Sequence, residues 1–302
     1  MIVVKIQNGL GNQLFQYATA RALSIFLNTE LKVDLQFYED PKNENAYRLF
    51  KFNLPIFIAT QIECNSLKSN IQIPKLYKLL SRLGYQSSKY YKTSHLFESK
   101  ILALYYREKR QLKDYYIEGW FGNEKYFFGI KDLLVNELNA NSLLNSKNQI
   151  TLEEINKSNS VSIHIRRGDY LNNPFFTNLS NTYYNNSIKR LLDEIENPIF
   201  YFFSNDINWV KNEFSKTPNS IFIDNNSFPD THFSNQGDIE DLMLMRSCKH
   251  QIIANSTFSW WGAWLNQNPE KIVIAPKKWY DNEKAQKEYE SSDFIPKEWI
   301  KI

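Results

Sequence analysis

Ile2-Val3-Val4-Lys5-Ile6 and the residues after it, Gln7-Asn8-Gly9-Leu10-Gly11-Asn12-Gln13, decide the fold of this chain. The β-branched run predicts a buried strand, and the glycine turn after it leads into apolar residues at helical spacing from Gln13 to about Leu27. Residues 31–35 predict a second strand. Strand, glycine turn, helix and strand form the first unit of an α/β sheet, whose ligands bind outside the carboxyl ends of its strands.

The second half of the chain alternates in the same way, so we predict a parallel doubly wound sheet in each half. Residues 115–120 predict a strand and 130–138 a helix, whereas 55–112 predict helix and irregular connection. The segment 139–159, rich in Asn, Ser and Lys, predicts an inter-domain linker, with domains 1–150 and 151–302. Later strands are predicted at 161–165, 199–203, 220–223, 251–254 and 271–275, and helices at 183–194, 209–214, 239–246 and 260–265.

The composition is that of a soluble globular protein, because 42% of the 302 residues are hydrophobic and 23% are charged. The net charge of +3 is too small to make nucleic acid an expected partner, so any anion must be recognised by a local cluster. Cys64 and Cys248 are too few for a disulfide framework or a closed zinc site. With no signal peptide and no membrane-spanning apolar run, we expect a cytoplasmic protein, and peripheral membrane association stays open.

The strongest sign of a ligand site follows the predicted strand 161–165, where the sequence reads His164-Ile165-Arg166-Arg167-Gly168-Asp169-Tyr170. Arginine presents a planar fork of donors that matches phosphate oxygens, so two arginines and a permissive glycine suit a diphosphate. Adjacent strand residues point to opposite faces, so we expect one of Arg166 and Arg167 to reach the ligand and the other to pair internally. The alternative is a solvated arginine–aspartate pair.

A second polar segment, Asn255-Ser256-Thr257, lies between the predicted strand 251–254 and a helix. Hydroxyl groups and free backbone N–H groups at a helix N-terminus form an anion site, so these residues are candidates for holding phosphates. Ordinary N-capping by Ser256 or Ser259 is the alternative. Together with the arginines, the segment would complete a pyrophosphate clamp.

The glycine turn near the start imitates a dinucleotide-binding fingerprint, because Gly9 and Gly11 follow a strand and Asp34 lies near the end of the next one. Leu14 stands where the fingerprint has its third glycine, which disfavours a nicotinamide or flavin cofactor. We therefore expect Gly11 to allow close backbone approach, and the amides of Asn12 and Gln13 to face a ligand across the domain cleft.

Several other chemistries lack their sequence signatures. The chain has no P-loop, no Asp-x-Asp triplet for a metal-bound sugar nucleotide and no Gly-x-Ser-x-Gly elbow of a hydrolase. Its four histidines lack the spacing of metal ligands. We therefore predict neither a metal site nor a cofactor.

Three motifs together resemble the alpha-1,2-fucosyltransferases of glycosyltransferase family 11. They occur in the family's order, span most of the chain and read Gly9-Leu10-Gly11-Asn12-Gln13-Leu14-Phe15-Gln16-Tyr17-Ala18, His164-Ile165-Arg166-Arg167-Gly168-Asp169-Tyr170 and Asn255-Ser256-Thr257-Phe258-Ser259-Trp260-Trp261-Gly262-Ala263-Trp264-Leu265. The chain departs from the family at Gly122-Asn123, where the pattern has Gln-Ser.

The resemblance implies two Rossmann-like domains that face each other across a cleft, the GT-B architecture, with the donor domain C-terminal and the last ~20 residues able to return to the first domain. It implies inverting, metal-independent transfer of L-fucose from GDP-β-L-fucose to the 2-hydroxyl of a terminal β-galactoside of a surface glycan. The partners would be GDP-fucose, as donor substrate, and this galactoside.

The motif match also implies roles for single residues. Arg166 or Arg167 would neutralise the diphosphate leaving group, and Ser256 and Thr257 would hold the phosphates from the other side. His164 and Asp224 would contact guanine or ribose.

The sequence leaves the general base and the finer function open. Asp169, Glu118 and Glu124 are candidate bases, although Asp169 is better suited to orienting an arginine, and Asn12 would orient the acceptor hydroxyl. Other functions that fit are a fucosyltransferase of another linkage, a non-catalytic sugar-nucleotide or glycan-binding protein, and a Rossmann oxidoreductase.

Overall fold

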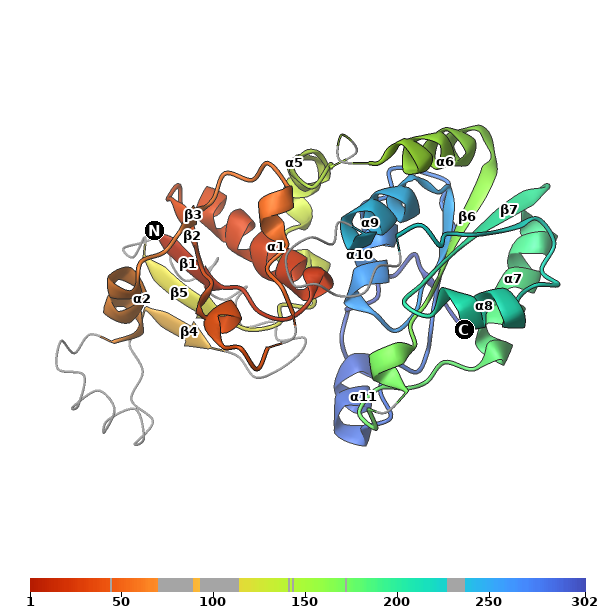
Figure 1. Ribbon diagram of the computed structural model, residues 1–302. Helices are drawn as coiled ribbons and strands as arrows, with labels where there is room; N and C mark the ends of the chain where they lie inside the picture. The colour runs from red at the N-terminus through yellow and green to blue at the C-terminus, as the bar shows by residue number, and fades with distance from the viewer. Residues whose placement is uncertain are drawn as a thin grey trace. The chain divides into compact units, whose positions relative to one another are not determined.

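The computed structural model describes residues 1–43, 45–69, 89–92, 114–140, 142, 144–171, 173–226 and 237–302. The chain divides into two compact units, Met1–Leu138 and Asn139–Ile302 (Figure 1). Each unit contains a parallel sheet with helices packed on it, so the predicted α/β class is confirmed.

The sheet of the first unit has the strand order β3-β2-β1-β5-β4 in the described residues, and all its pairings are parallel. The chain leaves β1 towards β2 and returns to the other side of β1 as β5, so the topological switch point lies between β1 and β5. The strands are β1 Ile2–Lys5, β2 Leu31–Asp34, β3 Phe57–Ile58, β4 Tyr90–Lys92 and β5 Tyr115–Glu118.

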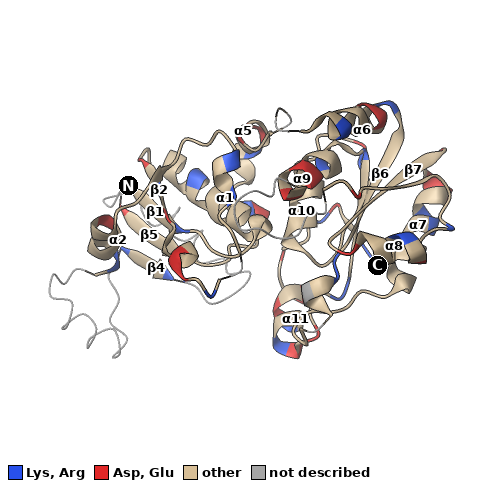
Figure 2. Cartoon of the chain, in the orientation of Figure 1, with Lys and Arg blue, Asp and Glu red and all other residues tan. Residues whose placement is uncertain are grey.

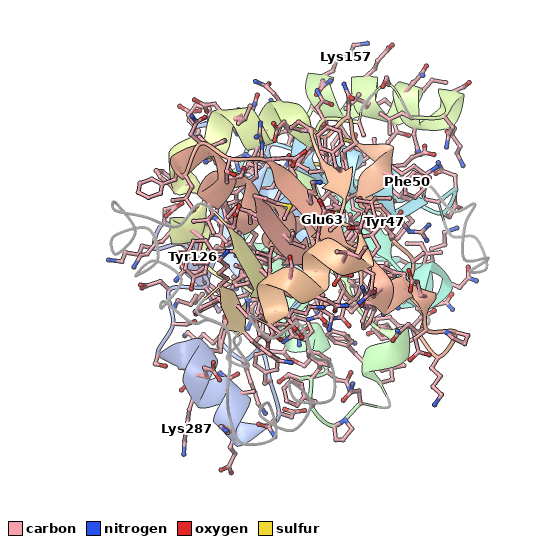
Figure 3. All side chains as sticks on the ribbon, turned by 90° about the vertical axis from the view of Figure 1, so that its left-hand side faces the viewer. Tyr47, Phe50, Glu63, Tyr126, Lys157 and Lys287 are labelled. Carbon is pink, nitrogen blue, oxygen red and sulfur yellow. The ribbon has the colours of Figure 1, made fainter. Side chains whose placement is uncertain are left out.

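Helices α1 and α2 lie on opposite sides of this sheet (Figure 1). A capping box between Thr60 and Glu63 begins α2, and Figure 3 labels Glu63 on this helix. The free thiol of Cys64 is buried and packs in the same apolar cluster as Tyr116 of the sheet. The helices of the unit are α1 Leu10–Phe26, α2 Gln61–Lys68 and α5 Lys131–Glu137, with short 3-10 helices at Gln36–Glu39, Leu49–Lys51, Glu124–Tyr126 and Phe128–Ile130.

Two expectations for this unit need correction. Helix α1 begins at Leu10 rather than Gln13, so the glycine turn already belongs to the helix, and the left-handed residue before it is Asn8, with φ 65°. The stretch 55–112 contains β3 and β4, which were not predicted because runs of two and three residues show no readable alternation. Residues 70–88 and 93–113 of that stretch lie outside the described residues.

The sheet of the second unit has the order β11-β10-β9-β6-β7-β8 and is parallel throughout its described pairings. Counted from β6, this is the order 3-2-1-4-5-6 of the dinucleotide-binding Rossmann fold, whose switch point lies between β6 and β9. The strands are β6 Asn159–Ile165, β7 Pro198–Ser204, β8 Ser220–Phe222, β9 His250–Ile252, β10 Val273–Ala275 and β11 Ile300–Lys301.

Helices cover both faces of this sheet (Figure 1). Alternate residues of β6 and β7, among them Ile163 and Phe202, form an apolar core with side chains of α7 and α8. Helices α6, α9 and α10 pack together on the other face. The helices are α6 Ser146–Lys157, α7 Asn181–Glu194, α8 Ile207–Glu213, α9 Gly237–Ser247, α10 Thr257–Trp264 and α11 Glu283–Glu290.

The segment predicted as a linker, 139–159, is mostly helix α6. Asn145 caps this helix by accepting a hydrogen bond from the Asn148 N–H group at 2.9 Å, and Asn148, Thr151 and Ile155 are buried. Two of the polar residues, Asn148 and Thr151, therefore face the interior, while most of the others lie on the exposed face of the helix. The division of the chain falls between Leu138 and Asn139, whereas the predicted boundary at residue 150 falls inside α6.

Charges of both signs occur in both units, for example on α2, α6 and α11, whereas α10 carries none (Figure 2). Within the described ranges, no helix has the length and apolar character needed to cross a membrane.

Candidate functional site

The carboxyl ends of β6 and β9 bring two predicted motifs together. These strands are hydrogen-bonded neighbours, with Ile163 opposite Ile252. Arg166 follows β6 directly, and Asn255 follows β9 just before α10 begins. Both motifs therefore flank the switch point of the second sheet, where open α/β sheets bind their ligands.

Arg167 is held inside the protein. Its Nε atom donates to Asp206 Oδ2 at 3.2 Å, and its guanidinium lies 3.6 Å from the centroid of the Trp209 ring. Its backbone N–H group donates to Asn205 Oδ1 at 2.9 Å. These contacts fix Arg167 at the start of α8, so Arg167 pairs within the protein.

Arg166 lies over a different aromatic ring, that of Tyr170. Its guanidinium carbon is 5.5 Å from the centroid of Tyr170, whose hydroxyl donates to the Asn255 backbone carbonyl at 3.2 Å. Tyr170 stacks on Phe176 with ring centroids 4.3 Å apart and planes inclined by 8°. Because Tyr170 is bonded to the residue that follows β9, the Arg166 guanidinium lies on the side of the second motif, whereas that of Arg167 lies at α8. Arg166 is therefore the arginine better placed for a ligand at the switch point.

Gly168 allows the chain to turn between these arginines and Tyr170. Its φ is 49°, and a Cβ atom there would lie 2.5 Å from Asn205 Nδ2. Asn205 is the residue that accepts the Arg167 N–H group, so a side chain at position 168 would disturb that bond directly. The backbone of Asp169 lies in the 3-10 helix Gly168–Tyr170, and its side chain lies outside the described residues.

His164 is buried in β6 as a neutral ring. Burial, and then the charge of Arg166, lower its pKa to about 3. Its ring lies 5.6 Å from that of Phe258 in the first turn of α10. Its Nδ1 atom has no hydrogen-bond partner among the residues that the structure describes. A buried polar atom without a partner is costly, so Nδ1 is available to a ligand or a water molecule. The predicted contact with guanine or ribose stays a prediction.

The Asn255 side chain acts within the protein. Its Nδ2 group donates to the carbonyls of Thr177 and Trp279, each at 2.8 Å. Ser256 caps α10 and accepts from the Phe258 N–H group at 3.3 Å, which is the ordinary N-capping considered above. Thr257 is the first residue of the helix. The predicted phosphate contacts therefore depend on the backbone N–H groups of this turn and the hydroxyls beside them.

Asp224 lies on the surface after β8. Its carboxylate accepts from Lys211 Nζ at 2.6 Å and Lys147 Nζ at 3.4 Å, and these lysines hold its pKa below the ordinary value, Lys211 most strongly. A base-specific contact would require a nucleotide to break an ion pair with Lys211.

In the first unit, Gln13 is a structural residue. Its Nε2 group donates to the carbonyls of Asn8 and Ala46, each at 2.8 Å, and its Oε1 atom accepts from the Arg48 N–H group at 2.8 Å. These bonds use both Nε2 protons and one lone pair of Oε1, so Gln13 holds the structure together here, and its predicted contact with a ligand stays a prediction. Its neighbours Gly11 and Asn12 lie in the first turn of α1, with Asn12 half-buried.

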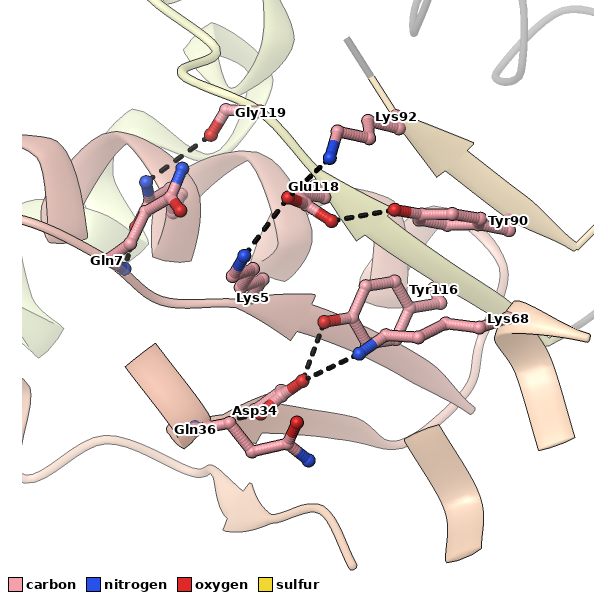
Figure 4. Close-up of polar contacts among 11 residues, drawn as sticks. Lys5, Gln7, Asp34, Gln36, Lys68, Tyr90, Lys92, Tyr116, Glu118 and Gly119 are labelled. Carbon is pink, nitrogen blue, oxygen red and sulfur yellow. Dashed lines mark hydrogen bonds and ion pairs between the residues drawn. The ribbon is translucent and has the colours of Figure 1, made fainter. Parts of the chain in front are cut away.

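Glu118, a candidate base, ends β5 at the first switch point (Figure 4). It accepts from Tyr90 at 2.7 Å and pairs with Lys5 and Lys92, each at 3.1 Å. Burial raises its pKa, but the Tyr90 hydroxyl and the lysines outweigh burial and hold the pKa below its ordinary value. A carboxylate with these partners is a weak proton acceptor. Glu124, the third candidate, begins a 3-10 helix.

Asp34, which imitated the acidic residue of a dinucleotide fingerprint, also forms hydrogen bonds with residues of its own unit (Figure 4). Its Oδ2 atom accepts from the Tyr116 hydroxyl at 2.6 Å and from Lys68 Nζ at 3.2 Å, while Oδ1 accepts from the Gln36 N–H group at 2.9 Å. Both carboxylate oxygens of Asp34 already accept hydrogen bonds within the protein, so the oxidoreductase alternative loses support.

Sequence reasoning missed a buried polar network at the start of α9. Asn148 Nδ2 donates to Glu240 and, at 2.7 Å, to Asn226, whose own Nδ2 group donates to Asp241 at 2.6 Å. Burial raises the pKa of Asp241 to about 7; the Asn226 bond opposes this, and Asp238 and Glu240 add to it. The sequence signal for this network was the three acidic residues within 238–241, at the start of a predicted helix. Among the described residues, no three acidic, His or Cys side chains could hold a metal ion together.

Comparison with known proteins identifies the family. The family model for Glycosyl transferase family 11 matches residues 1–302, the whole chain. The chain belongs to glycosyltransferase family 11. The resemblance drawn from the three motifs is thereby confirmed, and the protein is a glycosyltransferase.

Two relatives in this family are similar to the glycosyltransferase over nearly their whole lengths. An alpha-1,2-colitosyltransferase of Escherichia coli is 33% identical, with 100% of this chain and 99% of the relative covered. The O-antigen biosynthesis glycosyltransferase WbnK of Escherichia coli is 31% identical, with 91% and 93% covered.

Solved structures of similar fold include fucosyltransferase NodZ from Bradyrhizobium, with a TM-score of 0.51, 11% identity, and 91% of this chain and 94% of NodZ covered. A NodZ alpha-1,6-fucosyltransferase soaked with GDP-fucose gives a TM-score of 0.50, with 11% identity and 90% and 94% covered. At this identity the likeness concerns the fold of the glycosyltransferase alone.

Replacing Gly168 with alanine should destabilise the second unit. The left-handed backbone costs an alanine about 1–2 kcal/mol, and the Cβ atom would press on Asn205. Chemical denaturation measures the loss, and Gly129→Ala is the matched control because nothing lies within 4 Å of its Cβ position. Equal stability of the two variants would contradict the strained turn at Gly168.

Acid should destabilise the protein partly through His164. Its pKa is about 3 when folded and about 6.5 when unfolded, so only the unfolded chain takes up the proton as the pH falls from 6.5 towards 3. The free energy of unfolding should therefore fall by the order of 3 kcal/mol between pH 7 and pH 4 on account of this residue. Denaturation at both pH values should show a smaller fall for His164→Gln, whereas an unchanged fall would contradict the buried neutral ring.

Proposed function

We propose that this glycosyltransferase moves L-fucose, with inversion, from GDP-β-L-fucose to the 2-hydroxyl of a terminal β-galactoside during assembly of a surface glycan. The observation that carries the proposal is the pair of arginines at the second switch point, where Arg167 is anchored to Asp206 and Trp209 and Arg166 rests on Tyr170. One guanidinium anchored at the start of α8 and a second one on the side of α10 suit a single diphosphate.

Three similarities support the choice of sugar and linkage. The colitosyltransferase relative has an alpha-1,2 linkage in its name, WbnK acts in O-antigen biosynthesis, and the NodZ structure was soaked with GDP-fucose. The first relative also favours a second candidate function, transfer of colitose, which is fucose without its 3-hydroxyl group. Both sugars are L-sugars that lack the hydroxyl at carbon 6.

We propose a single in-line displacement. The acceptor oxygen bonds to the anomeric carbon as the bond to the diphosphate oxygen breaks, and the acceptor proton passes to a base or to the leaving phosphate. Arg166 and the N–H groups of the first α10 turn would stabilise the charge that develops on the diphosphate, which makes a metal ion unnecessary. Glu118 is a poor base because its carboxylate already accepts a hydrogen bond from Tyr90 and pairs with two lysines.

The two arginines should differ when each is replaced by alanine. Arg166→Ala should lower kcat/KM by about 10²–10³, as does the loss of other preorganised donors to a developing charge. Arg167→Ala should lower activity less and cost about 1 kcal/mol of stability, because it loses the Trp209 contact. Steady-state kinetics and denaturation measure both effects, with Arg190→Ala, a surface pair with Glu194, as the neutral control. A larger activity loss for Arg167→Ala would contradict the assignment.

The transfer itself is tested with GDP-L-fucose and a panel of β-galactosides in the presence of EDTA. We expect a product with an α-1,2-linked fucose, identified by NMR, and at least about 100-fold less of it from the Arg166→Ala chain in the same time. Absence of product with every galactoside tried would overturn the function. Product that appears only after Mg²⁺ is restored would overturn the metal-independent mechanism and leave the transfer intact.

A further inference from the structure

Four aromatic side chains form a patch beside the second switch point, which we call the aromatic patch: Tyr170, Phe175, Phe176 and Tyr280. Phe176 stacks on Tyr170 on one side and lies 5.7 Å from the Tyr280 ring on the other. Phe175 lies 5.2 Å from Phe176 and 5.1 Å from Tyr280, in edge-on contacts. The rings therefore form one continuous apolar cluster drawn from two distant parts of the chain, with Tyr280 buried and Phe175 and Phe176 half-buried.

The backbone holds the aromatic patch in place at the end of β9. Phe176 and Tyr280 form an antiparallel bridge, and the Thr177 N–H group donates to the Trp279 carbonyl at 3.3 Å. Asn255 then ties both strands of this bridge to β9, because its Nδ2 group reaches the carbonyls of Thr177 and Trp279. The patch is therefore fixed relative to the switch point rather than being a loose surface loop.

The position and exposure of the aromatic patch point to a ligand. The Arg166 guanidinium lies 5.5 Å from the centroid of Tyr170. The aromatic patch is therefore adjacent to the arginine that we assign to the diphosphate. Phe175 and Phe176 are only half-buried, although phenylalanine is usually fully buried. Thr177 and Asp281, which follow Phe176 and Tyr280 in the sequence, place polar groups next to the patch: Thr177 donates to Asp281 Oδ1 at 3.1 Å, and Lys278 pairs with the same oxygen at 2.6 Å.

We propose that the aromatic patch binds the sugar of the donor nucleotide and selects a sugar without a hydroxyl at carbon 6. This inference rests on the proposed function, since it takes Arg166 as the diphosphate contact. A methyl group buried against rings gains apolar contact, whereas a hydroxyl there would lose its water partners without replacement. An apolar pocket disfavours an added hydroxyl by up to about 100-fold.

The test compares the binding of three nucleotides by isothermal titration calorimetry. GDP reports on the phosphate and base contacts alone, GDP-L-fucose adds the 6-deoxy sugar, and GDP-L-galactose differs from GDP-L-fucose only by the hydroxyl at carbon 6. The intact chain should bind GDP-L-fucose at least about 10-fold more tightly than GDP-L-galactose. Phe176→Ala should bring this ratio close to one and leave the Kd for GDP unchanged.

Two further variants keep the test sharp. Phe175→Ala serves if Phe176→Ala does not fold, and it should reduce the same ratio. Leu192→Ala, on α7 with 39% of its surface exposed, is the control that should change no Kd.

Each contrary result has a distinct meaning. An intact chain that binds GDP but does not distinguish the two sugars would overturn this inference, as would aromatic variants that keep the ratio. Equal weakening of all three nucleotides in Phe176→Ala would show that the ring supports Arg166 instead of the sugar, and would also overturn it. An intact chain that binds none of the three would instead refute the proposed function.

Discussion

The two hydrogen bonds that Asn255 donates to the carbonyls of Thr177 and Trp279 organise the second unit around its switch point. They join the end of β9 to two segments that lie far apart in the sequence. The Asn255 carbonyl in turn accepts from Tyr170, which links the end of β9 to the end of β6 and supports Arg166. The position of Arg166 over Tyr170 and the order of the aromatic patch both depend on this amide and carbonyl.

Much of the fold could be predicted because buried parallel strands are continuous apolar runs. Residues 199–203 are such a run, residues 161–165 have β-branched apolar residues at every second position, and both are strands. Strands β3, β4 and β11 are too short to show a pattern, and pairing with a neighbour makes them strands. Helix α6 was mistaken for a linker because its buried face contains the polar residues Asn148 and Thr151, and the hydrogen bonds of Asn148 to Asn226 and Glu240 are invisible in the sequence.

The candidate site could be predicted in its location but only partly in its roles. The motifs at His164 and Asn255 follow adjacent strands because the sheet order places β6 beside β9. The division between Arg166 and Arg167 depends on Asp206 and Trp209, which no local pattern connects to an arginine. Gln13 illustrates the same limit, since an amide in a glycine turn resembles a ligand group until its partners are known.

The central claim is that the second switch point holds a nucleoside diphosphate through Arg166 and the start of α10. A crystal structure of the chain with GDP tests it most directly. The account predicts the β-phosphate within hydrogen-bonding distance of the Arg166 guanidinium and of a backbone N–H group in the first turn of α10, with Arg167 still paired to Asp206. GDP bound in the first unit, or phosphates held by Arg167 with Arg166 remote from them, would contradict it.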